Sequence, residues 1–137
     1  MNLNGFQIEN LIYCGNSTNL YRGWRNHDQQ PVIIKQLNKS YPSKEELARF
    51  RQEYTIMHGI HSSDIIKAYS QEKCQNSLAM ILEDFNGQSI EKLLPGWEFE
   101  LGNFLKLAIQ ITKIIARIHQ EKIIHKNIDI RFIIALL

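Results

Sequence analysis

The order of short strand-like runs around one strongly marked helix constrains the fold of this chain more than any other feature. Ser43, with Glu46 three residues later, forms a capping box, and apolar residues at helical spacing extend this helix to about His58. Strand-like runs precede and follow the helix, at residues 6–13, 19–25, 31–35, 65–70 and 77–82. Short polar turns separate the runs, which predicts an antiparallel sheet with one helix.

The second part of the chain has a different pattern, dominated by one long amphipathic helix over residues 103–120. Its apolar stripe consists of Phe104, Leu107, Ala108, Ile111, Ile115 and Ile118. The sequence therefore predicts an α+β fold, with a five-stranded sheet and one helix in residues 1–88 and a mostly helical part in residues 89–137. Because the stripe is too apolar to leave in water, we expect residues 103–137 to be covered by self-association or by a protein partner.

Charge and composition exclude several classes of protein. The chain of 137 residues has 16 Lys and Arg against 14 Asp and Glu, and its net charge of +2 argues against a nucleic-acid binder. The N-terminus lacks a secretory signal, and the longest apolar run, residues 132–137, is too short to span a membrane. Cys14 and Cys74 are too few for a disulfide framework, and no metal site is predicted. We therefore expect a cytoplasmic protein that binds neither nucleic acid nor membrane.

Several features that bear on chemistry follow one another in a definite order. A Val-Ile-Ile-Lys strand ends at Lys35, and Glu53 lies on the helix that follows. The apolar run at residues 78–82 leads directly into Glu-Asp-Phe, and an Ile-His-Lys-Asn segment containing His125 comes after the long helix. This order resembles the first half of a Ser/Thr protein kinase domain, in particular the kinase domain that opens large bacterial multidomain signalling proteins.

The resemblance implies an ATP site and assigns residues to it. The site would be lined by Ile12, Gly15, Leu20, Ile33, Lys35, Leu82, Glu83 and Phe85. Lys35 would contact the phosphates, and Glu53 would orient it. His125 and Asn127 would belong to the catalytic loop. Two simpler interpretations stay open, namely a strand-end lysine that reaches water and an ordinary helical pair between Glu53 and Arg49.

The chain also departs from the kinase pattern at positions that matter for catalysis. Asn127 stands where the family has the aspartate that accepts the substrate proton, and an amide cannot accept it. Asp129 replaces a lysine that faces the transferring phosphate, and Phe132 replaces an asparagine that holds magnesium. Only Gly15 survives of the three loop glycines, and Ile33 is bulkier than the usual alanine. We therefore expect weak or vestigial ATP binding, no magnesium site, and loss of phosphoryl transfer to protein Ser/Thr.

Three hypotheses follow from these observations. The sequence ends at Leu137, before any Asp-Phe-Gly motif, so the first hypothesis is a truncated kinase-like domain with a remnant of the ATP site. The second is a non-catalytic signalling or interaction module that binds no nucleotide. The third is a non-functional gene fragment. Nucleotide binding distinguishes the first hypothesis from the second.

Overall fold

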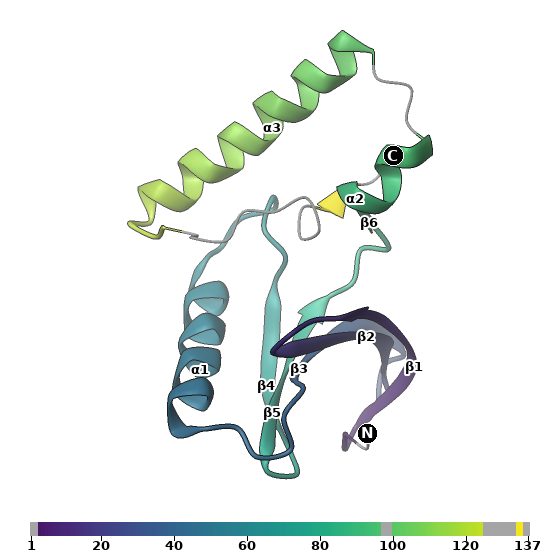
Figure 1. Ribbon diagram of the computed structural model, residues 1–137, viewed down its shortest axis with the longest axis vertical. Coiled ribbons are helices and arrows are strands. Elements are labelled where there is room, and N and C mark those ends of the chain that lie inside the picture. The colour runs from purple at the N-terminus through teal and green to yellow at the C-terminus, as the bar shows by residue number, and fades with distance from the viewer. Residues whose placement is uncertain (1–2, 97–99, 125–133, 136–137) are drawn as a thin grey trace. The chain divides into compact units, whose positions relative to one another are not determined.

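The chain divides into two units, Met1–Phe85 and Asn86–Leu137. The structure is a computed structural model, and it describes residues 3–96, 100–124 and 134–135. Figure 1 shows a twisted sheet with helix α1 beside it in the first unit, and mostly helical structure in the second. This arrangement confirms the predicted α+β fold.

A five-stranded antiparallel sheet makes up most of the first unit. Its elements along the chain are β1 (Phe6–Cys14), β2 (Thr18–Arg25), β3 (Gln30–Leu37), α1 (Lys44–Gly59), β4 (Ala68–Cys74) and β5 (Ser77–Glu83). The strands lie in the order β1-β2-β3-β5-β4, so β3 and β5 occupy the interior of the sheet. Because these two central strands are covered on both faces, side chains on both of their faces are buried, and each strand therefore contains a continuous apolar run.

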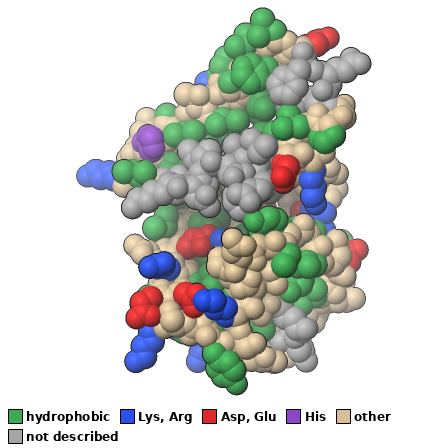
Figure 2. Space-filling model, in the orientation of Figure 1, with side chains coloured by type: hydrophobic (Ala, Val, Ile, Leu, Met, Phe, Trp, Pro, Cys, Tyr) green, Lys and Arg blue, Asp and Glu red, His purple; other side chains and the backbone are tan. Residues whose placement is uncertain are grey.

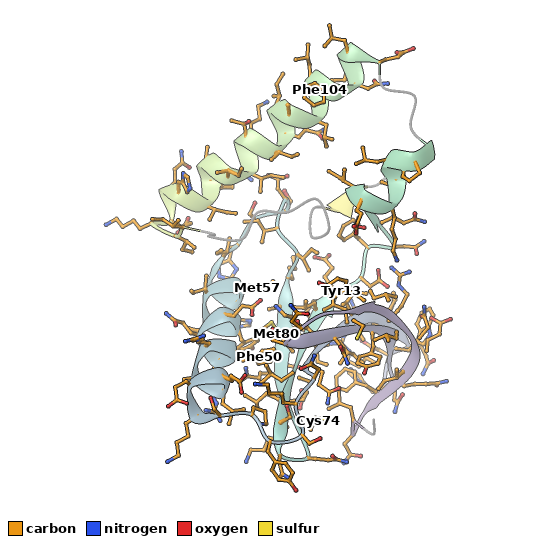
Figure 3. All side chains as sticks on the ribbon, in the orientation of Figure 1. Tyr13, Phe50, Met57, Cys74, Met80 and Phe104 are labelled. Carbon is orange, nitrogen blue, oxygen red and sulfur yellow. The ribbon has the colours of Figure 1, made fainter. Side chains whose placement is uncertain are left out.

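Alternating side chains of β3 and β5 build two separate cores. On one face Val32, Ile34 and Ile81 are fully buried, in a cluster that also contains Leu3 and Ala79. The opposite face carries Ile33, Leu37, Leu78, Met80 and Leu82 and is covered by α1. From α1, Phe50 and Met57 project toward Met80, as Figure 3 shows.

The start of α1 confirms the predicted capping box. The Ser43 hydroxyl accepts a hydrogen bond from the Glu46 amide (3.2 Å), and the Glu46 carboxylate accepts one from the Ser43 amide (2.8 Å). Both amides would otherwise lack a partner at the first turn of the helix. Helix α1 therefore begins where the local sequence predicts it.

Strand β4 corrects one prediction. The sequence predicts this strand at residues 65–70, followed by a long polar turn, whereas β4 runs from Ala68 to Cys74. The polar residues 71–73 belong to the strand because β4 is an edge of the sheet, where one side of each residue stays near water. Gln75, with φ of 55°, makes the tight turn to β5.

The second unit contains one long helix and several short elements. These are β6 (Gln88–Ser89), α2 (Ile90–Leu93), the 3₁₀ turn η1 (Leu94–Gly96), α3 (Leu101–Gln120) and β7 (Ile134–Ala135). The pairing of β6 with β7 was not predicted. Within residues 3–96 and 100–124, no helix has the length and apolar character needed to cross a bilayer.

Helix α3 leads to a testable prediction about self-association. None of its residues is buried, and the exposed fractions are 46% for Phe104, 49% for Leu105 and 53% for Ile109. Because such an apolar face is poorly solvated, we expect light scattering to detect oligomers whose share rises with protein concentration. The double variant Phe104→Ser/Ile109→Ser should be largely monomeric, whereas Lys113→Ser on the same helix should behave as the unchanged chain. A chain that stays monomeric at every concentration would contradict the prediction.

Candidate functional site

An ion pair between β3 and α1 is the most distinctive charged contact of the first unit. The Lys35 ammonium donates to the Glu53 carboxylate, with Nζ and Oε1 2.5 Å apart. The two side chains are 21% and 41% exposed, so neither is fully solvated. The expected contact is therefore present, and Glu53 joins Lys35 across the fold instead of serving only as a helical neighbour of Arg49.

The four predicted slot residues Ile12, Leu20, Ile33 and Leu82 lie on the same face of the sheet as Lys35. Leu20 is the register neighbour of Lys35 on β2, and Ile33 is the neighbour of Leu82 on β5. Ile33 and Leu82 are buried, and Ile12 and Leu20 pack against the cluster that contains them. The structure thus brings a lysine and an apolar surface together on one face.

Glu83, the last residue of β5, and residues 84–85 directly after it border this face. The Glu83 amide donates to the Lys67 carbonyl (2.9 Å), and the Lys67 amide donates to the Glu83 carboxylate (3.2 Å). Next to it, the Asp84 carboxylate accepts two hydrogen bonds from the Arg22 guanidinium of β2, at 2.6 and 3.2 Å. These contacts anchor Glu83 to Lys67, the residue before β4, and Asp84 to β2.

The turn between β1 and β2 closes on itself. The Gly15 amide donates to the Thr18 carbonyl (2.9 Å), and the Asn38 side chain donates to the Gly15 carbonyl (2.8 Å). A Cβ on Gly15 would lie 2.7 Å from the ring of Tyr13, which Figure 3 labels, so a larger residue would clash there. The predicted phosphate cradle therefore has its Gly15 amide already engaged within the turn.

The remaining predicted site residues, His125 and Asn127, lie outside the described residues, as do Asp129 and Phe132. Among the residues that the structure does describe, no three His, Cys, Asp or Glu side chains gather as metal ligands would. On the face shown in Figure 2, acidic and basic side chains alternate over the first unit and form no patch of one sign.

Comparison with known proteins decides the family. A family model of the protein kinase domain matches residues 6–133. This chain belongs to the protein kinase family. It is 27% identical, over 89% of its length, to the serine/threonine-protein kinase STY17 of Arabidopsis thaliana. It is also 20% identical, over 89% of its length, to the serine/threonine-protein kinase 36 of Pongo abelii.

A third similar protein is the mitogen-activated protein kinase kinase kinase 3 of Arabidopsis thaliana, which is 26% identical over 86% of this chain. The chain spans only 21%, 9% and 20% of the lengths of these three relatives. The finer resemblance to bacterial multidomain proteins stays a prediction.

Two contacts that border the site, one made by Asn38 and one by Arg22, were not predicted from the sequence. Asn38 ties the β1–β2 turn to the end of β3, and Arg22 binds Asp84 from a position 62 residues away. One signal was present for Arg22, since a charged residue shares its strand face with the apolar Leu20. No local pattern indicated the partner of either residue.

Proposed function

We propose that the first unit of this kinase-family chain binds an adenine nucleotide, and that the chain does not transfer phosphate. The observation that carries the proposal is the Lys35–Glu53 ion pair, located on the same sheet face as the apolar residues Ile33 and Leu82. A nucleotide needs an apolar surface for its base and a cation for its phosphates. One face of the sheet offers both.

Each group has a definite role in this proposal. Ile12, Leu20, Ile33 and Leu82 supply the surface for the adenine ring, and the backbone of residues 83–85 supplies hydrogen-bond groups for its edge. Lys35 binds the phosphates as a point charge. The Glu53 carboxylate holds the ammonium in place, so the lysine loses less conformational freedom when the nucleotide binds.

The proposed loss of phosphoryl transfer rests on the catalytic-loop sequence. Asn127 stands at the position of the proton-accepting aspartate, and a neutral amide cannot take up the proton of a serine hydroxyl. Asp129 would bring negative charge toward the transferring phosphate, which is repulsive. Phe132, at the place of a magnesium-binding asparagine, offers no oxygen ligand.

Calorimetric titration of the purified chain tests this proposal. We expect ATP to bind with a dissociation constant on the order of 0.1–1 mM, because Ile33 crowds the base and the Gly15 amide is engaged. Magnesium should change the affinity little, and no labelled phosphate should reach a generic protein substrate. Micromolar affinity that requires magnesium would contradict the proposal, as would a phosphotransfer that Lys35→Ala abolishes.

A second candidate is an interaction module that binds no nucleotide. It is favoured by the closed β1–β2 turn, where the side chain of Asn38, directly after β3, donates to the Gly15 carbonyl. The same titration decides between the candidates, because a folded chain that gives no heat with ATP or adenosine would support the second. The exposed apolar face of α3 would then be the first surface to test for protein binding.

A further inference from the structure

The ion pair between Arg22 and Asp84 differs from the other arginine pair of the sheet in its burial. The Asp84 carboxylate is only 5% exposed, although it lies in the short segment that follows β5. The Arg22 guanidinium donates a hydrogen bond to each carboxylate oxygen, from Nε at 2.6 Å and from Nη2 at 3.2 Å. Such a two-point contact fixes the orientation of a carboxylate as well as its position.

The register of the sheet places this contact at the edge of the proposed adenine surface. Arg22 is the neighbour of Ile33 on β3, and Ile33 is the neighbour of Leu82 on β5. Asp84 is two residues beyond Leu82. The arginine therefore reaches past β3, on the side of the sheet that carries Leu20, and holds the segment beyond β5.

We propose that Arg22 is a positioning residue for nucleotide binding, which holds residues 83–85 in the conformation whose backbone groups meet the adenine edge. This inference rests on the function proposed above. Glu83 is the last residue of β5, and Asp84 and Phe85 follow it outside any strand or helix, so strand pairing does not hold their backbone. Arg22 supplies two charge-assisted hydrogen bonds that offset the burial of the Asp84 carboxylate, so its removal favours a position of this carboxylate nearer to water and a shift of the backbone beside it.

Removal of Arg22 is expected to lower the fraction of molecules in which residues 83–85 are placed for binding adenine. If the loss of Arg22 lowers the share of molecules with residues 83–85 correctly placed to about a tenth, the affinity for adenosine falls about tenfold. The contribution of the phosphates should not change, because Lys35 and Glu53 are untouched. Affinities for ATP and for adenosine should therefore fall by the same factor.

Arg25 provides a matched control on the same strand. It forms a similar two-point pair with Asp28, at 3.0 and 2.6 Å, but this carboxylate is 37% exposed and lies in the β2–β3 turn. Arg22→Met and Arg25→Met remove the same charge and keep most of the side-chain length. Arg22→Lys keeps the charge but cannot form the two-point contact, so its adenosine affinity should lie between those of the unchanged chain and Arg22→Met.

The test measures two properties of the full chain. Amide hydrogen exchange of the free protein should be faster at residues 84 and 85 in Arg22→Met, and unchanged there in Arg25→Met. Calorimetry should show the parallel tenfold loss of adenosine and ATP affinity in Arg22→Met alone. Circular dichroism spectra that match the spectrum of the unchanged chain establish that each variant is folded. If Arg22→Met does not fold, the same measurements are made on Arg22→Lys.

The outcomes separate this inference from the proposed function. Unchanged exchange at residues 84 and 85 would overturn it, and so would faster exchange with unchanged adenosine affinity. A larger loss for ATP than for adenosine would also overturn it, since Arg22 would then act on the phosphates. If the unchanged chain binds neither ligand, the proposed function and the nucleotide role of Arg22 both fail, and the exchange data still show whether Arg22 orders the segment.

Discussion

Replacing Phe50 by alanine is expected to lower the free energy of unfolding by about 3–5 kcal/mol. Phe50 is the one buried residue of α1, with 3% of its surface exposed, and it lies in the cluster that includes Met80 and Leu82. Its truncation removes the main anchor of the helix and leaves a cavity that the rigid sheet cannot close. A typical domain has about 5–15 kcal/mol of stability in total, so about a fifth or more of it would be lost.

Urea unfolding followed by circular dichroism measures this effect. Ile56→Ala on the same helix is the matched control, because Ile56 is 36% exposed and should lose less than about 1 kcal/mol. Equal losses in the two variants would mean that α1 does not use Phe50 to pack on the sheet. The position of α1 on the sheet, and therefore the placement of Glu53 beside Lys35, would then need another explanation.

Replacing Lys35 by methionine is expected to weaken ATP binding about 10- to 100-fold, since a hydrogen bond to a charged group is worth about 1.5–3 kcal/mol. Adenosine affinity should stay the same, because adenosine carries no phosphate for the lysine to bind. Glu53→Gln should cause a smaller loss of ATP affinity, since the ammonium stays in place but is no longer held by an opposite charge.

Titration of each variant with ATP and with adenosine measures the difference. Lys39→Met is the control, because Lys39 pairs with Glu46, is 56% exposed and lies outside the proposed adenine surface. It should leave both affinities unchanged. If Lys35→Met and Lys39→Met weaken ATP equally, the effect would come from overall charge, and the proposed role of Lys35 would be wrong.

Local sequence determined much of the fold. The capping box at Ser43, the apolar spacing of α1, and the runs that form β1, β2, β3 and β5 all depend on residues near one another in the chain. Such patterns predict elements because hydrogen bonding within a turn and the burial of one helix face are short-range effects. The order of these elements, together with Lys35 and Glu53, was enough to indicate the kinase family.

Only the tertiary structure decided which side chains meet. Lys35 pairs with Glu53, which lies 18 residues later in the sequence, and Arg22 pairs with Asp84, which lies 62 residues later. Each choice depends on strand register, which places Arg22 beside Ile33 and Ile33 beside Leu82. The limits of β4 depend likewise on its pairing with β5 at the sheet edge. Register arises from the packing of the whole sheet, and a shift of one residue would turn every side chain to the other face, so no local pattern carries this information.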